Sequence, residues 1–275
     1  NWTLTGSNTL AAGMTLTDSG TLTDSGTLIN AGLITGAAKG VLLTAGARVT
    51  NQSGGTIAGS STGISASGAA TLVNAGLISG NPTIAGDSGV YLTAGGSVTN
   101  QSGGTISAYY GIWSKSAATT VVNAGTIAGK RAVNQGTFAG AGIKLTSGGH
   151  ITNQSGGTIS GYYGIKAKGG ATATVVNTGA ITGYGSNPSS AGVYNSVTGS
   201  GTVTNQSGGT ISGYDGIIEV AGAGTVVNAG IIISTGTTAG NGIDLNAGGL
   251  VINQSGGTIS GPNGIDGAAR TTVVN

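Results

Sequence analysis

The sequence contains no cysteine, one histidine, three prolines and few charges, and these shortages exclude several classes of protein. Without cysteine there is no disulfide framework, no thiolate metal site and no cysteine nucleophile. Nine Lys/Arg and seven Asp/Glu leave a net charge of +2, too thin to neutralise a run of phosphates, so we expect no nucleic-acid partner. No apolar run is long enough for a transmembrane helix, so we expect no membrane insertion by this segment.

Glycine is the residue present in excess, at 58 of 275 positions. The glycines do not recur strictly at every third position, which excludes collagen. Val, Ile and Thr are frequent between them, so the low charge does not indicate disorder. We therefore expect a chain that folds by packing alone.

Two motifs alternate along the chain. The string Asn-Gln-Ser-Gly-Gly-Thr-Ile begins at Asn51, Asn100, Asn153, Asn205 and Asn253. The motif Val/Ile-Asn-Ala/Thr-Gly lies between these copies, with its asparagine at Asn30, Asn74, Asn123, Asn177 and Asn228. Self-similarity at a regular period indicates a repeat architecture in which neighbouring units share one core.

Each unit reads as three short runs of period two, Val-x-Asn, Gly-Thr-Ile-x-Gly and Gly-Ile-x-Leu, and each run is closed by Gly or Asn. Such runs predict three strands and three turns per unit, and glycine recurs too often for helices. We predict an all-β parallel β-helix of roughly 11–12 three-strand rungs stacked about 4.8 Å apart. Residues 1–275 form one solenoid, with shorter coils over 1–29 and the repeated rungs over 30–275.

Stacking the units in register predicts ladders of identical side chains. One inward ladder contains Val41, Ile64, Val90, Ile112, Ile143, Ile165, Val193, Ile217, Ile243 and Ile265. Another contains Ile57, Ile78, Ile106, Ile127, Ile159, Ile181, Ile211, Ile232 and Ile259. We expect the ten motif asparagines to form a structural ladder at a buried corner, where stacked amides bond one another and the turn backbone.

These repeated Val-x-Asn-x-Gly-x-Ile-x-Gly rungs, the opening segment from Trp2 to Leu10 and the lack of cysteine resemble a known family. They are similar to the passenger domains of bacterial autotransporters (type V secreted proteins), especially the self-associating and adhesive ones. Large filamentous haemagglutinin-type exoproteins look similar as well. The resemblance implies a right-handed helix and an extracellular location at the bacterial cell surface.

The chain offers little for chemistry. Polysaccharide-cleaving β-helices need several clustered carboxylates, and only Asp244 and Asp266 fall at matching positions on adjacent rungs. We interpret them as a solvated surface pair. His150 is the only histidine and no serine has a histidine placed to activate it. We expect no enzyme activity, no metal and no cofactor.

The column directly outside the first inward ladder is a candidate recognition surface. It contains Leu42, Ser65, Tyr91, Trp113, Lys144, Lys166, Tyr194, Ile218, Asp244 and Asp266. An aromatic pair, a lysine pair and an aspartate pair follow one another along it, so two antiparallel rods could bring lysines against aspartates. The alternative is a set of scattered exposed side chains on a strand face.

A second aromatic row is expected at the turns before those strands. It contains Tyr109, Tyr110, Tyr162, Tyr163 and Tyr214. Tyrosine offers an apolar face and a hydroxyl, which suits contact with a glycan or a protein, and the alternative is packing of the turns onto neighbouring rungs.

We hypothesise an adhesin whose faces mediate self-association, aggregation, biofilm or fibre formation. Its partner is either itself, by lateral or antiparallel rod pairing, or a host or bacterial surface protein or glycan. A flat face rich in small hydroxyls, including Thr56, Thr105 and Thr126, leaves ice binding open. Glycan binding is another alternative, and a polysaccharide-acting enzyme is less favoured.

Overall fold

A computed structural model describes residues 2–130, 140–169 and 172–275. These residues contain 35 strands and no helix, hence no helix that could cross a membrane. Successive strands pass through three parallel sheets in turn, so each strand pairs with the third strand before it and the third strand after it. The result is a β-solenoid of about 11 turns with three strands per rung, which confirms the fold class predicted from the repeats.

The strands divide evenly among sheets A, B and C. Sheet A contains β1 (Trp2–Leu4), β4 (Thr21–Asp24), β7 (Lys39–Leu43), β10 (Thr62–Ala66), β13 (Ser88–Leu92), β16 (Tyr110–Ser114), β19 (Ala141–Leu145), β22 (Tyr163–Gly169), β25 (Ala191–Val197), β28 (Asp215–Glu219), β31 (Asn241–Leu245) and β34 (Asn263–Gly267). Sheet B contains β2 (Ser7–Leu10), β5 (Thr27–Asn30), β8 (Arg48–Asn51), β11 (Ala70–Asn74), β14 (Gly96–Asn100), β17 (Thr119–Asn123), β20 (Gly149–Asn153), β23 (Ala173–Asn177), β26 (Thr202–Asn205), β29 (Gly224–Asn228), β32 (Gly249–Asn253) and β35 (Thr271–Val274). Sheet C contains β3 (Thr15–Asp18), β6 (Leu33–Gly36), β9 (Thr56–Gly59), β12 (Leu77–Ser79), β15 (Thr105–Ala108), β18 (Thr126–Gly129), β21 (Thr158–Gly161), β24 (Ala180–Gly183), β27 (Thr210–Gly213), β30 (Ile231–Ser234) and β33 (Thr258–Ser260).

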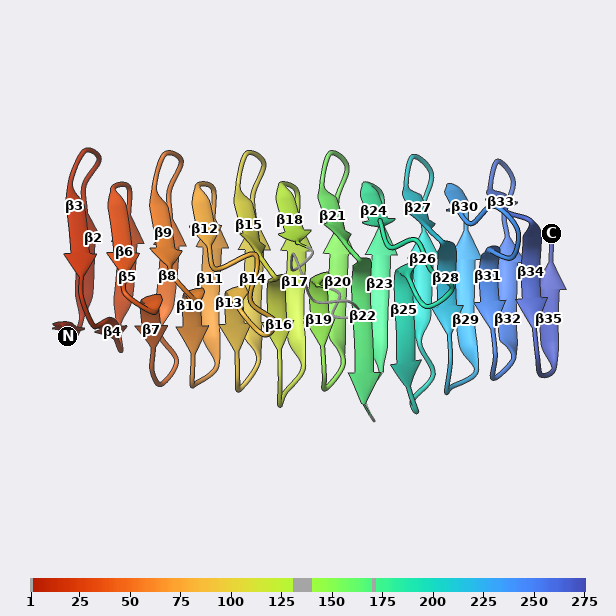
Figure 1. Cartoon of the computed structure of the whole chain (residues 1–275), viewed down its shortest axis with the longest axis horizontal. Coiled ribbons are helices and arrows are strands. Elements are labelled where there is room, and N and C mark those ends of the chain that lie inside the picture. The colour runs from red at the N-terminus through yellow and green to blue at the C-terminus, as the bar shows by residue number, and fades with distance from the viewer. Residues whose placement is uncertain (1, 131–139, 170–171) are drawn as a thin grey trace.

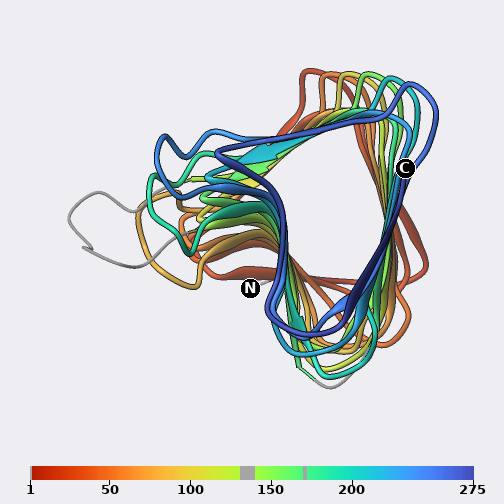
Figure 2. The same ribbon diagram turned by 90° about the vertical axis from the view of Figure 1, so that its right-hand side faces the viewer.

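The rungs stack into a rod. Figure 1 shows them side by side along the long axis, with the two termini at opposite ends. Figure 2 looks along that axis, where the rungs lie nearly over one another around a three-sided interior. A long connection, residues 184–190, joins β24 to β25, and residues 131–139, between β18 and β19, lie outside the described residues.

Ladders of aliphatic side chains fill the interior, and sheet A contributes two of them, the second containing Leu43, Ala66, Leu92, Leu145, Ala167 and Leu245. Ile112 pairs with Ile143 in sheet A and Ile106 with Ile127 in sheet C, as the repeats predicted, and all four side chains are fully buried. Sheet B adds a ladder of Val49, Leu72, Val98, Val121, Ile151, Val175, Val203, Val226 and Val251. Each such side chain contributes about 1.5–3 kcal/mol by its burial.

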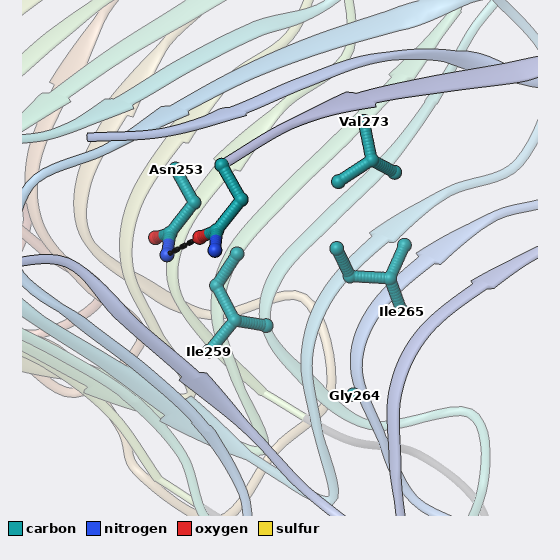
Figure 3. A pocket seen from close by; sticks show the side chains of 6 residues that line it. Asn253, Ile259, Gly264, Ile265 and Val273 are labelled. Carbon is teal, nitrogen blue, oxygen red and sulfur yellow. Dashed lines mark hydrogen bonds between the residues drawn. The ribbon is translucent and has the colours of Figure 1, made fainter. Parts of the chain in front are cut away.

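One residue from each sheet meets at the centre of every rung. Figure 3 shows this arrangement in the last rung, where Ile259 of β33, Ile265 of β34 and Val273 of β35 point toward a common hollow. The interior is therefore filled by ladders that interlock rung by rung, rather than by contacts between elements distant along the rod.

The motif asparagines form a continuous amide ladder at the corner between sheets B and C. Every one from Asn30 to Asn228 is fully buried, and each donates its side-chain Nδ2 to the Oδ1 of the asparagine one rung on, at 2.7–2.9 Å. The same Nδ2 groups also reach carbonyl oxygens of their own turns, as Asn51 does with Gly55 at 3.1 Å. These bonds satisfy polar groups whose burial would otherwise oppose folding.

The N-terminal coils join the same three sheets through shorter turns. The duplicated Asp-Ser-Gly segments are explained by local hydrogen bonding, because the Asp18 Oδ1 accepts the Gly20 N–H at 2.8 Å and the Asp24 Oδ1 accepts the Gly26 N–H at 3.1 Å. An aspartate that bonds the backbone two residues on stabilises a tight turn.

Breaking the amide ladder at one rung should destabilise the rod. The change Asn123→Ala removes the acceptor for Asn100 at 2.9 Å and the donor to Asn153 at 2.8 Å, leaving buried amide groups without partners. We expect a loss of about 2–4 kcal/mol in unfolding free energy, measured by urea denaturation. Thr120→Ala, at an exposed position of the same strand, is the matched control. Equal midpoints for the two variants would contradict a structural role for the ladder.

Candidate functional site

The outer face of sheet A carries the candidate recognition column, and strand pairing brings its members into line. Leu42, Ser65, Tyr91, Trp113, Lys144, Lys166, Tyr194, Ile218, Asp244 and Asp266 are consecutive register partners. Ser65 and Ile218 are buried, whereas Asp266 is exposed and the other seven are partly exposed. The face runs along the lower front of the rod in Figure 1.

The first cluster on this face surrounds Lys144. The ring of Tyr91 meets that of Trp113 edge-on with centroids 4.9 Å apart, and Tyr110 lies 5.4 Å from Trp113. The Lys144 Nζ lies 4.1 Å from the Trp113 centroid and 4.5 Å from that of Tyr110. It also donates a hydrogen bond of 3.3 Å to the Tyr110 hydroxyl. Cation–π attraction therefore holds this lysine against the sheet.

A second cluster surrounds Lys166 on the next strand. Its Nζ lies 3.8 Å from the ring centroid of Tyr163 and 5.3 Å from that of Tyr194, and these two rings are 5.2 Å apart. Tyr162 lies beyond them, 5.0 Å from Tyr163. Three of the turn tyrosines therefore lie against the outward column of sheet A and form one surface with it. This surface, here called the Lys–aromatic patch, contains Tyr91, Tyr110, Trp113, Lys144, Tyr162, Tyr163, Lys166 and Tyr194.

Burial changes the pKa of both lysines. It lowers the pKa of Lys144, and it lowers the pKa of Lys166 to about 8, with the neighbouring lysines acting in the same direction. No carboxylate is among the groups that shift either pKa. The patch therefore presents positive charge that the described part of this chain leaves uncompensated.

Two of the five turn tyrosines follow the alternative given above, packing against neighbouring rungs, and are buried. Tyr109 is 1% exposed and Tyr163 is 6% exposed. Tyr109 packs edge-on against Tyr110 at 4.7 Å, and Tyr163 opens strand β22, where its ring lies beneath the Lys166 ammonium. Tyr214 lies in the turn between β27 and β28 with its ring against Gly236, away from the patch.

Two carboxylates lie toward the other end of the same face, and a third, that of the buried Asp215, is close to one of them. Asp244 and Asp266 are register partners, and Asp215 lies nearby with its Oδ1 accepting the Asn241 N–H at 2.6 Å. Burial raises the pKa of Asp215 to about 6 and also raises that of Asp244, and charge repulsion from Asp266 adds to the second shift. The solvated pair expected from sequence holds for Asp266, while Asp244 is partly buried.

A polar pair that sequence reasoning missed lies inside the rod, directly beneath Tyr194 and Ile218. Asn195 and Glu219 pair in register with exposed fractions of 2% and 1%, at positions that hold leucine in other rungs, such as Leu145. Space comes from glycine, because a Cβ at Gly201 would lie 1.7 Å from the Asn195 amide. Period-two spacing from the inward Ile217 was the signal that could have placed Glu219 inside.

Within the described residues, Asn195 Oδ1 and Glu219 Oε1 are buried without hydrogen-bond partners. Burial raises the pKa of Glu219 to about 8, although a hydrogen bond from Asn195 acts in the opposite direction. The carboxyl therefore keeps its proton near neutral pH, which avoids a buried negative charge.

The other residues considered for a metal site or a binding face lie outside the Lys–aromatic patch. Among residues 2–130, 140–169 and 172–275, no three His, Cys, Asp or Glu side chains are grouped so that they could hold a metal ion. His150 is exposed on sheet B, within 3.3 Å of the Thr152 hydroxyl. The hydroxyl face, with Thr56, Thr105 and Thr126, is the outer face of sheet C, interrupted by the exposed Leu77 and Ile231.

Comparison of the chain with protein-family models, curated proteins and solved structures gives no match.

Stability should fall as pH rises through the titration of Glu219. Its folded pKa of about 8 exceeds the ordinary 4.5, so the stabilisation is complete below pH 4.5 and is lost as pH rises to about 8. We expect a loss on the order of 3–5 kcal/mol over this interval. Urea midpoints at pH 5 and pH 9 should differ more for the native chain than for Glu219→Gln, whose amide does not titrate. The same pH dependence in both proteins would contradict the assignment.

Proposed function

We propose that this β-solenoid is a non-catalytic adhesive rod of the bacterial cell surface, and that it associates with a second copy of itself through the outer face of sheet A. The resemblance of its rungs to autotransporter passengers supports the location. The observation that carries the self-association is the order of side chains along this face, with Lys144 and Lys166 on neighbouring strands at the Lys–aromatic patch and Asp244 and Asp266 on neighbouring strands further along.

The order of the charges along the column selects an antiparallel pairing. The lysines lie on β19 and β22, the aspartates on β31 and β34, and only β25 and β28 separate them. A twofold axis between β25 and β28 places Lys166 opposite Asp244 of a second rod and Lys144 opposite its Asp266. The same axis brings Tyr194 of one rod against Ile218 of the other.

Such a pairing neutralises four charged sites of each rod at once. The lysine side chains are already held by aromatic rings, so less conformational freedom is lost when the partner docks. A twofold interface is self-complementary, since the same surface serves both rods. Because the opposing charges are partly exposed, salt should weaken the association.

Charge reversal tests this arrangement directly. One rod carries Lys144→Glu and Lys166→Glu, and another carries Asp244→Lys and Asp266→Lys. Each alone should remain monomeric by sedimentation because like charges meet, whereas an equimolar mixture should form dimers at least tenfold more readily than either variant alone. The native chain should dimerise less in high salt.

A mixture that stays monomeric while the native chain dimerises would overturn the antiparallel register. A native chain that stays monomeric at all concentrations would overturn self-association and favour a host protein or a glycan as the partner. If a reversed variant misfolds by circular dichroism, the neutral pair Asp244→Asn and Asp266→Asn replaces it and should also fail to dimerise.

A further inference from the structure

The corner between sheets B and C carries a row of five identical turns that the self-association does not use. Each is a Gln-Ser-Gly-Gly turn, at residues 52–55, 101–104, 154–157, 206–209 and 254–257. In each, the second glycine donates its N–H to the glutamine carbonyl at 2.9 Å. Figure 1 shows these tall turns along the upper edge of the rod, alternating with the short turns that follow Asn74, Asn123, Asn177 and Asn228.

The fold explains most of the repeated string. Asn51 belongs to the amide ladder and Ile57 to the core. Gly54 has a φ of 80°, which disfavours any residue with a Cβ, and a Cβ at Gly55 would lie 2.6 Å from the Asn30 carbonyl. The equivalent glycines in the other four turns have the same environment.

The fold does not explain the glutamine and the serine. All ten side chains are exposed, and in the part of the chain that the structure describes none of them makes a hydrogen bond. The outward threonine after each turn (Thr56, Thr105, Thr158, Thr210 and Thr258) is also identical in all five rungs, whereas the outward column of sheet A from Leu42 to Asp266 differs from rung to rung. Five identical pairs of unengaged amides and hydroxyls indicate contact with something outside the rod.

Open, shallow hollows lie between the turns. One of about 410 Å³ lies over the short turn at Ala75 and Gly76, between Ser53 and Ser102 of neighbouring tall turns. Another of about 280 Å³ lies over Thr178 and Gly179, between Ser155 and Gly208. No charged residue lines either hollow. Successive tall turns are two rungs apart, a pitch of about 9.6 Å.

The polar groups along the row of turns limit the class of ligand that could bind there. Each turn offers hydroxyl and amide groups that both donate and accept hydrogen bonds, with no charge and no aromatic ring. A ligand rich in neutral hydroxyls satisfies such groups, and a polymer with a repeat near the pitch can engage several turns together. Extended β-1,4-linked polysaccharides repeat every two sugar rings over a closely similar distance.

We infer that the row of Gln-Ser-Gly-Gly turns is a binding edge for a neutral, extended β-1,4-linked polysaccharide lying along the rod, with one disaccharide repeat for each tall turn. Each contact is weak because it is solvent-exposed, and affinity comes from engaging several turns of one rigid row at once.

The test uses the full chain and cello-oligosaccharides of increasing length as the probe, with binding followed by calorimetry and by retention on amorphous cellulose. Affinity should rise in steps of two sugar units and reach on the order of a hundredfold over the disaccharide. Replacing all five glutamines and all five turn serines by alanine should abolish binding while leaving the circular dichroism spectrum unchanged. The variant Lys144→Glu/Lys166→Glu is the control and should bind as the native chain does.

Absence of binding at every length, or equal binding by the alanine variant, would overturn the inference. If the alanine changes instead reduce dimerisation without any effect on sugar, the edge contacts a second copy and the polysaccharide is excluded. Because the control variant separates the two surfaces, failure here leaves the pairing through sheet A standing or falling on its own test.

Discussion

Hydrogen bonding between the amides of neighbouring asparagines is the constraint from which the rest of the structure follows. A buried amide that meets its neighbour at 2.7–2.9 Å on every rung permits no slip in register. A shift of one residue would expose the isoleucine ladders and bury outward side chains. The ladder therefore fixes the inward and outward positions of all three sheets, and with them the line of charges on sheet A. It also explains why a core made mainly of aliphatic side chains suffices, since the amide hydrogen bonds specify the register of the strands.

The architecture could be predicted from the sequence because two independent features of the repeats indicate it. One is the spacing of the repeats along the chain, and the other is the period-two alternation within each repeat. The rung count, the Ile112 and Ile127 ladders and the partners of the outward column all follow from counting residues along the repeats. The arrangement of side chains at the corner between sheets C and A did not follow. Tyr109 is buried between β15 and β16, where the chain bends from sheet C into sheet A and alternation does not apply, whereas the burial of Tyr163 follows the alternation of β22, two residues before the inward Ile165. The cation–π contacts of Lys144 and Lys166 depend on this same bend.

The interior pair of Asn195 and Glu219 shows how a solenoid accepts a local exception. Each rung packs only against its neighbours, so a polar substitution need be accommodated over two or three rungs alone. Gly201 and Gly224 supply the room, and a retained proton removes the charge. Because the outward Tyr194 and Ile218 are the adjacent residues on the same two strands, the chemistry of the interior lies one side chain away from the centre of the proposed interface.

The alternation of tall and short turns has a consequence for how such rods change length. Insertion or loss of a single rung would bring two tall turns, or two short ones, side by side, and would interrupt the hollows between them. Gain or loss of a pair of rungs leaves the amide ladder, the core and the spacing of the upper edge intact. The unit of duplication is therefore two coils, and rods of this type should differ in length by whole pairs of coils.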